Sequence, residues 1–458
     1  MNTRLSRPSG ARLFAREVSA LVPLALPLIL GQLFGIGTDL VLTILGGHMG
    51  PKVMAAVSLG ASLWIVAFMA VLGMMMSVQP AVARLHGARA EHEAGHVYAQ
   101  ALMLGLAWGA FGGLMLGLVA PHFVAALGLP PAVLPGVHGF LHGAAFSIPA
   151  LGLFAAGRGL SEGLSKTRPT MLVGGFGLVC LIPVALVLMH GALLPGFGRV
   201  GGYGPLGAGI AISFVLCLEA LAYILWIALS GRYPMVVWSR AAFKPDRRML
   251  LRLVRVGAPI AGAIVMEVCM FSVATLMVGR FGAVAVAGHQ VALMTASVFF
   301  MVPLGLSLAV TVRVGRARGA HDRAGMRRAG LAGFAVMLGM QCVSAACMFG
   351  LGHAIAGIFT HDPAVVALGA SLLAIAALFQ FADGTQVIAM AALRGMEDTR
   401  TPMLLAMLAY WLCGIPLGGL LAFAGHLGVR GVWFGLMGGL MLAAALLVSR
   451  FLWNVRRA

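Results

Sequence analysis

LGGHMGPKVMAAV at residues 45–57 and MVGRFGAVAVAGH at residues 277–289 occupy equivalent places in two halves of one chain. The two stretches align with an offset of 232 residues. The same offset superimposes identical residues elsewhere: Pro27 on Pro259, Gly47 on Gly279, Gly50 on Gly282, Arg84 on Arg316 and Gly87 on Gly319. Self-similarity of this kind indicates an internal duplication, so whatever fold one half adopts, the other should repeat.

The composition is that of an integral membrane protein. The 458 residues are 61% hydrophobic and only 10% charged, with a mean hydropathy of +1.00, which leaves too little polar surface for a water-soluble domain. Apolar stretches long enough to cross about 30 Å of hydrocarbon as helices recur along the chain. We expect twelve, at residues 19–46, 53–82, 95–119, 133–157, 169–192, 205–229, 252–279, 285–312, 326–351, 362–392, 402–424 and 430–452. The predicted fold class is all-α.

The duplication divides these helices into two pseudo-symmetric lobes of six. Residues 1–235 form the predicted N-terminal lobe and residues 236–458 the C-terminal lobe, joined by a basic linker from Arg232 to Arg255. Because six is even, both halves begin on the same side of the membrane and are parallel repeats about an axis along its normal. Two like lobes around a central cleft suit a transporter that works by alternating access.

The formal charge of +18 reflects topology rather than a nucleic-acid partner. With a cytoplasmic N-terminus, 27 of the 31 lysines and arginines fall in cytoplasmic segments, as the positive-inside rule requires. An even number of spans returns the C-terminus to the cytoplasm as well. The basic surface therefore indicates contact with anionic membrane lipids and excludes nucleic acid as the expected partner.

Two carboxylates lie deep in predicted spans of different lobes. Residues 265–271 read VMEVCMF, which places Glu267 near the middle of an apolar segment. A charge at that depth costs about 3 kcal/mol or more, so such an acid is either neutralised or holds a cation. In the first span, Asp39 and Gln32 are seven residues apart and project from one helical face.

A third intramembrane acid, Asp383, has no acidic counterpart at the equivalent position of the N-terminal half. Asp383 lies between Gln380 and Gln386 at spacings of three residues, with Phe379 one turn away. Together, Glu267 and Asp383 are the minimum for an oxygen-lined cation site that holds a sodium ion, a shared proton, or each in turn. The alternative is that each acid is simply protonated and hydrogen-bonded to a neighbouring helix.

The other acids divide into one intramembrane residue and several loop residues. Glu219 lies in the sixth predicted span, where it is either a local packing partner or a cavity residue. Four acids sit among arginines in predicted cytoplasmic loops, and solvated ion pairs explain them: Glu162, Asp246, Glu397 and Asp398.

One apparent enzyme motif does not support an enzyme. Residues 92–96 read HEAGH, which satisfies the H-E-x-x-H signature of zinc proteases. That site needs a continuous helix, a third ligand and a protected cleft, whereas this stretch lies in a short predicted loop with Gly95 inside it. No Walker A sequence occurs, so ATP is not the expected energy source. We expect no catalytic activity and no cofactor, and an ion gradient as the driving force.

Several dispersed motifs together resemble the multidrug and toxic compound extrusion (MATE) family, and its NorM-like branch in particular. They cover nearly the whole chain: TDLVLTILGGHMG at 38–50, RGLSEGLSKTRPTM at 158–171, AGHQVAL at 287–293 and FADGTQVIAMAALRG at 381–395. The resemblance implies a V-shaped, two-lobed antiporter of the bacterial inner membrane, monomeric, that expels cationic or amphipathic drugs in exchange for sodium ions or protons. A lipid-linked oligosaccharide flippase of the same superfamily is the alternative.

The resemblance also assigns the site residues. Glu267 and Asp383 match the NorM-like cation site of the C-terminal lobe, and Asp39 matches the first-helix acid of the N-terminal lobe. The family's frequent Asp-Thr pair is Asp39–Leu40 here, which removes a hydroxyl beside the acid. The expected substrate-binding residues are those on the polar faces around these acids: Asp39, Gln32, Phe379, Gln380 and Gln386.

Overall fold

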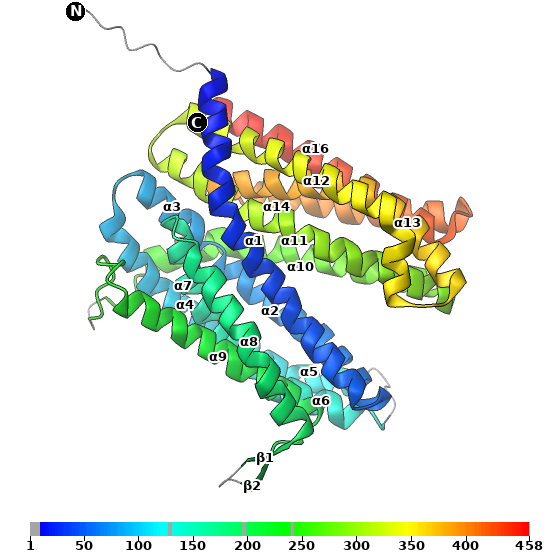
Figure 1. The fold of residues 1–458 in the computed structure, drawn as a ribbon. Helices are drawn as coiled ribbons and strands as arrows, with labels where there is room; N and C mark the ends of the chain where they lie inside the picture. The colour runs from blue at the N-terminus through cyan, green and yellow to red at the C-terminus, as the bar shows by residue number, and fades with distance from the viewer. Residues whose placement is uncertain (1–9, 127–130, 195–197, 240–241, 458) are drawn as a thin grey trace, which may run out of the picture. The chain divides into compact units, whose positions relative to one another are not determined.

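The computed structural model describes residues 10–126, 131–194, 198–239 and 242–457 (Figure 1). Within these residues, twelve helical spans are long and apolar enough to cross a membrane. The predicted all-α membrane fold is therefore confirmed. The structure extends several spans beyond the predicted ends, since the third runs from Glu91 to Ala126 and the tenth from Pro363 to Gly395.

The described fold separates into two compact units. The unit that we call the N unit comprises Leu30–Val268, and the C unit comprises Met1–Ile29 with Cys269–Ala458. The helices α1 (Gly10–His48) and α10 (Arg247–Gly279) each contribute to both. Because this division falls inside two helices, it does not test the lobe boundary between residues 235 and 236, which stays a prediction.

In the described residues of the N unit, eight further α-helices lie within the membrane spans. They are α2 (Pro51–Met75), α3 (Val78–Gly87), α4 (Ala94–Leu114), α5 (Ala120–Ala126), α6 (Leu134–Ala145), α7 (Ser147–Gly163), α8 (Arg168–His190) and α9 (Pro205–Leu229). Helices α8 and α9 lie side by side and are joined through a two-stranded antiparallel hairpin, β1 (Ala192–Leu194) and β2 (Gly198–Val200) (Figure 1). This hairpin was not predicted from the sequence.

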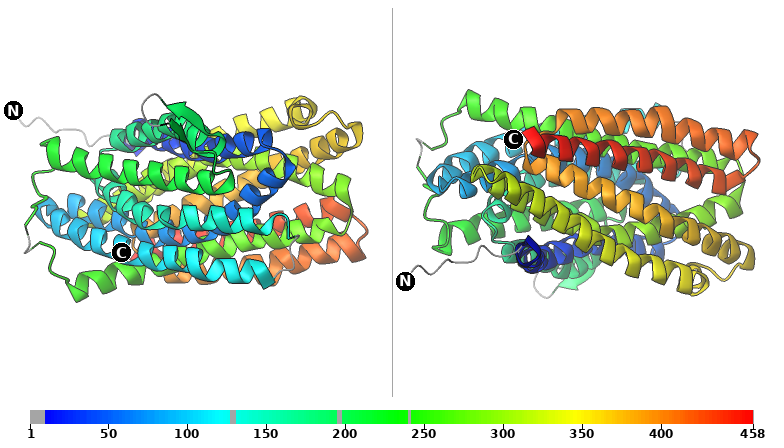
Figure 2. Two further views of the ribbon diagram at one scale, coloured as in Figure 1. Left: turned by 90° about the horizontal axis from the view of Figure 1, so that it is seen from below. Right: turned by 90° about the horizontal axis from the view of Figure 1, so that it is seen from above.

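The C unit is organised around α13 (Pro363–Gly395), which packs against α11 (Ala283–Gly319), α12 (Arg323–Phe359) and α16 (Gly428–Arg457). In the right view of Figure 2, α12, α13 and α16 run side by side, coloured from yellow to red. The eleventh span alternates between α-helical and π-helical turns: α14 (Arg400–Met407), η3 (Leu408–Gly414), α15 (Ile415–Gly419) and η4 (Leu420–Ala424).

Local sequence explains where several helices begin. Proline occupies the first position of α2, α9 and α13, where its missing N–H is not needed. At the start of α13 the Asp362 carboxylate accepts a hydrogen bond from Ala364 N at 2.9 Å, and Asp322 caps α12 through Gly325 N at 2.8 Å. Such caps satisfy backbone donors that the helix itself leaves unpaired.

Two spans of the N unit are each divided into two consecutive helices. The second breaks between α2 and α3 at Met76 and Ser77, and the fourth between α6 and α7 at Phe146. At the second of these breaks, Ser147 Oγ donates to Ala144 O at 2.5 Å and accepts the indole N–H of Trp64 at 2.9 Å. The hydroxyl thus adds a second donor to the Ala144 carbonyl at the break and holds the Trp64 indole beside it.

Small residues allow the closest helix pairs. A Cβ added to Gly152 of α7 would lie 2.1 Å from Gly105 O of α4, and one added to Gly435 of α16 would lie 2.1 Å from the Cα of Gly418 in α15. Backbones that approach this closely exclude any side chain at the crossing, the usual basis of helix association in membranes.

The first turns of α1 are fastened to the C unit by a two-pronged ion pair. Arg313 of α11 donates to both carboxylate oxygens of Glu17, Nε at 2.7 Å and Nη2 at 2.8 Å. Farther along, Ile29 packs so tightly on Gly305 that an added Cβ would come within 2.6 Å. These contacts explain why α1 belongs to the C unit up to Ile29.

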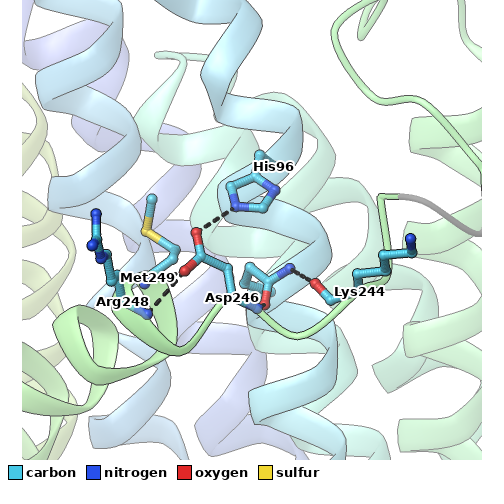
Figure 3. Close-up of polar contacts among 6 residues, drawn as sticks. His96, Lys244, Asp246, Arg248 and Met249 are labelled. Atoms are coloured by element: carbon cyan, nitrogen blue, oxygen red, sulfur yellow. Dashed lines mark hydrogen bonds and ion pairs between the residues drawn. The ribbon is translucent and has the colours of Figure 1, made fainter.

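Hydrogen bonds to two side chains of α4, Gln100 and His96, hold the segment before α10 against that helix (Figure 3). Gln100 Nε2 donates to Lys244 O, and its Oε1 accepts Asp246 N, each at 2.9 Å. The Asp246 carboxylate accepts the His96 Nε2–H at 3.1 Å and caps α10 through Arg248 N at 2.9 Å. The hydrogen bond from His96, and then that from the Met249 backbone, lower the pKa of the exposed Asp246 carboxyl below its ordinary value.

Candidate functional site

The polar face of α13 is buried inside the C unit. The four residues predicted from the sequence are all nearly inaccessible to solvent: Phe379, Gln380, Asp383 and Gln386. Gln380 Nε2 donates to Ala296 O of α11 at 2.9 Å, while its backbone and side-chain oxygens accept Gln341 Nε2 of α12 at 2.7 and 3.1 Å. The amide of Gln380 therefore links three helices.

Aromatic rings enclose the turn that precedes Asp383. The Phe379 ring is edge-on to Phe271 with a centroid distance of 6.2 Å and to Trp433 with one of 5.7 Å. Edge-to-face pairs of this kind add stability beyond the area that they bury. Phe379 is only 2% exposed, so the substrate contact expected for it is covered by its neighbours in this conformation.

A hydrogen-bonded chain fixes the orientation of Trp433. Its indole N–H donates to His289 Nδ1 at 3.2 Å, and His289 Nε2 lies 3.0 Å from Thr275 Oγ1, which donates to Phe271 O at 3.0 Å. Since Nδ1 accepts, the ring N–H must be on Nε2 and point at Thr275. Both nitrogens of the buried His289 are thereby used in positioning the aromatic wall.

The other two predicted acids are placed less completely. Glu267 lies on α10, in the N unit, with a partly exposed side chain, whereas Asp383 belongs to the C unit. Asp39 lies on α1, but its side chain falls outside the described residues. The cation site that combines Glu267 with Asp383 accordingly stays a prediction. Among the described residues, no group of three or more His, Cys, Asp or Glu side chains could hold a metal ion.

In the N unit, Gln32 belongs to a buried charge network that the sequence analysis missed. Gln32 Oε1 accepts Arg158 Nη2 of α7 at 2.8 Å, and Arg158 Nε donates to Glu162 Oε1 at 2.6 Å. The Glu162 carboxylate also accepts Gln79 Nε2 at 2.8 Å and Thr170 Oγ1 at 3.2 Å. Donors from α3, α7 and α8 thus converge on one carboxylate, and α1 joins the network through its bond to Arg158.

The predicted solvated ion pair at Glu162 is wrong. Glu162 lies in α7 and is 2% exposed, because the helix continues to Gly163 instead of ending near residue 157. A buried ionised carboxylate needs hydrogen bonds and a counter-charge, and here it has both. The only local signal was the i, i+4 spacing of Arg158 and Glu162. Asp398, by contrast, is partly exposed and pairs with Arg450 at 2.9 Å.

The HEAGH stretch has a structural role at its second histidine. His92 lies in a separate 3-10 turn, Glu91–Glu93, and only the histidine at position 96 is within α4. The broken helix cannot present both histidines on one face. His96 instead donates to Asp246, as described above.

Comparison with known protein families identifies the family of this chain. The MatE family model matches twice, at residues 27–187 and again at 259–420. The chain belongs to the MatE family. The two matches begin at Pro27 and Pro259, the pair that opens the internal duplication, so the predicted repeat is confirmed.

Full-length relatives place this MATE protein in the NorM-like branch, as its motifs predicted. A probable multidrug resistance protein NorM of Xanthomonas campestris pv. campestris is 40% identical over 460 residues, covering 100% of this chain and 98% of the relative. Multidrug resistance protein PmpM of Pseudomonas aeruginosa is 37% identical over 453 residues, covering 98% of this chain and 94% of the relative. The chain is therefore a multi-pass MATE transporter.

Solved structures agree on the fold. The crystal structure of the eukaryotic MATE transporter AtDTX14 superposes with a TM-score of 0.86, covering 97% of this chain and 98% of that one, at 20% identity. At that identity the match speaks for the MATE fold alone.

Proposed function

We propose that this MATE transporter is a multidrug efflux antiporter, which exports cationic or amphipathic compounds in exchange for sodium ions or protons. It would act as a monomer in the bacterial inner membrane, with both termini in the cytoplasm and without a cofactor. The observation that carries the proposal is the likeness over the whole chain to relatives such as a probable multidrug resistance protein NorM that is 40% identical.

The exchange follows from the cost of an intramembrane charge. Asp383 is 4% exposed in the middle of a hydrophobic span, and an ionised carboxylate there needs a positive partner. A drug cation and a coupling cation can each provide that charge. Binding of one then weakens binding of the other, and this negative coupling makes transport an exchange.

The aromatic wall beside Asp383 suits cations with apolar bodies. Aromatic faces attract cations by about 0.5–2 kcal/mol, and the T-shaped contacts of Phe379 with Phe271 and Trp433 hold the rings in one arrangement. Because Phe379 is covered by its neighbours, a drug reaches it only after helices of the C unit move apart. Alternating access provides such a movement.

The test is ethidium efflux from proteoliposomes with a sodium gradient or a pH gradient imposed separately. Glu267→Gln and Asp383→Asn should abolish gradient-driven efflux while the protein still inserts and folds. Asp362→Asn is the matched control, because it makes the same chemical change on the same helix at an exposed cap, where Asn also caps well. Normal efflux by either test variant would refute the assigned site. Vesicles that translocate a lipid-linked oligosaccharide but move no ethidium would favour the flippase alternative.

A further inference from the structure

Glu219 is a carboxylate of α9 that the proposed cation site does not use. It lies well inside the span Pro205–Leu229, with a partly exposed side chain. The neighbouring helix α8 has a glycine at the point of contact: a Cβ added to Gly177 would lie 1.7 Å from Glu219 Oε1 and 2.5 Å from its carboxyl carbon. Gly177 therefore forms a notch into which the carboxylate fits, and any side chain there would displace it.

The Arg158 guanidinium interacts with two carboxylates, those of Glu162 and Glu219. Arg158 donates to Glu162 at 2.6 Å and also acts electrostatically on Glu219. Glu162 already takes the charge of Arg158 and also accepts hydrogen bonds from Gln79 and Thr170. If Glu219 were also ionised, the group of three would have one negative charge in excess, in a part of the protein where such a charge is costly.

No other described cation offsets that charge. On the helices packed against α9, the ionisable side chains are Lys52 of α2, His138 and His142 of α6, Arg158 and Glu162 of α7, and Arg168, Cys180 and His190 of α8; α9 itself adds Cys217 and Tyr223. Of these, Arg158 is near enough to the Glu219 carboxylate to act on it electrostatically. A metal cation is disfavoured as the ligand, because the guanidinium repels it and the wall at Gly177 leaves no room on that side.

We propose that Glu219 is a proton-exchange site of the N unit, and that Arg158 transmits its ionisation to Gln32. When the carboxyl O–H gives its proton to water, the new charge attracts the guanidinium, which already binds Gln32 Oε1 on α1 at 2.8 Å. Because α1 contributes to both units, a proton at Glu219 reaches a helix that transport would move. That consequence rests on the proposed antiport, whereas the titration of Glu219 does not.

Infrared difference spectroscopy of the purified full-length protein, titrated from acid to alkaline pH, tests the site. Protonated carboxyls in apolar surroundings give a C=O band apart from those of exposed carboxyls. Glu219→Gln should lose one such titrating band, and Glu219→Asp should keep it with a shifted midpoint. A Glu219→Gln spectrum that retains every titrating carboxyl band overturns the proposal.

Two alanine variants on α8 test the notch. Gly177→Ala should shift the band, since its Cβ would collide with the carboxylate. Gly174→Ala, on the same helix, should leave it unchanged because its Cβ would meet only Phe34 at 4.0 Å. Equal behaviour of the two variants overturns the notch. Gln32→Ala should move the midpoint if Arg158 couples the two residues, and an unmoved midpoint overturns that coupling.

The two proposals fail separately. Asp383→Asn that pumps ethidium at the original rate refutes the antiport site and leaves the Glu219 band as it was. A missing Glu219 band in wild-type protein refutes only the proton-exchange site.

Discussion

Removal of Arg158 should show how much the buried network around Glu162 contributes to the free energy of unfolding. Glu162 is 2% exposed and accepts three side-chain hydrogen bonds, of which the one from Arg158 Nε is the shortest at 2.6 Å. Arg158→Met keeps most of the apolar stem but leaves a buried carboxylate without its counter-charge, a change that costs about 3–5 kcal/mol. Glu162→Gln removes the charge and mismatches one donor, at about 1–3 kcal/mol.

The double variant is the decisive measurement. With Arg158→Met and Glu162→Gln combined, no uncompensated charge remains, so the cost should fall short of the sum of the single costs by about 2 kcal/mol. The free energy of unfolding can be measured reversibly in mixed detergent micelles by tryptophan fluorescence. Arg168→Met, at an exposed arginine, is the control and should change stability by less than about 0.5 kcal/mol. Additive costs would show that the two side chains do not stabilise each other.

Three further outcomes follow from contacts in the N unit. Gln100→Ala deletes the two hydrogen bonds between its amide and the linker backbone; at about 1 kcal/mol each, the linker should open about 30-fold more often, measured as tryptic cleavage after Arg247. Since the bond from His96 lowers the pKa of Asp246, that contact is complete above the ordinary Asp value of about 3.9 and is lost as pH falls through the lowered value. His96→Ala should therefore release the linker at a higher pH in pepsin digestion, and an unchanged pH profile would contradict this. Gly152→Ala would bring a Cβ within 2.1 Å of a backbone oxygen of α4 and should lower the thermal midpoint in detergent, as overpacking costs about 1–3 kcal/mol.

The spans and the duplication could be predicted because their signals are local or periodic. A run of apolar residues specifies a transmembrane helix without reference to distant partners. The short hairpin β1–β2 was not predicted. The continuation of α7 through Glu162 was not predicted either, because arginine and glutamate in one segment look the same in the sequence whether solvent or protein surrounds them. Only Gln79 and Thr170, which approach in the fold, decide between the two.

The sequence shows that polar residues lie within the tenth span, but it does not show which partners they bind. Gln380 was expected to bind substrate, but its amide connects α11, α12 and α13, and that requirement arises from carbonyls on other helices. His289 lies inside a motif that the family resemblance uses, yet its link to Trp433 spans 144 residues of chain. A polar residue in an apolar span signals some buried partner, and sequence alone does not say which.

Two acids of the N unit, Glu162 and Glu219, differ chiefly in their supply of donors. Glu162 has a guanidinium, an amide and a hydroxyl, and a carboxylate so well satisfied gains nothing from exchanging a cation, which makes it structural. For Glu219 the sole charged influence among the described residues is an arginine already committed to Glu162. An acid that shares its counter-charge with a second carboxylate is neutral in one state and ionised in another at modest cost. Ion coupling requires such a change of charge. The depth of a carboxylate in the membrane therefore identifies a candidate, and the count of donors around it separates a structural acid from an exchanging one.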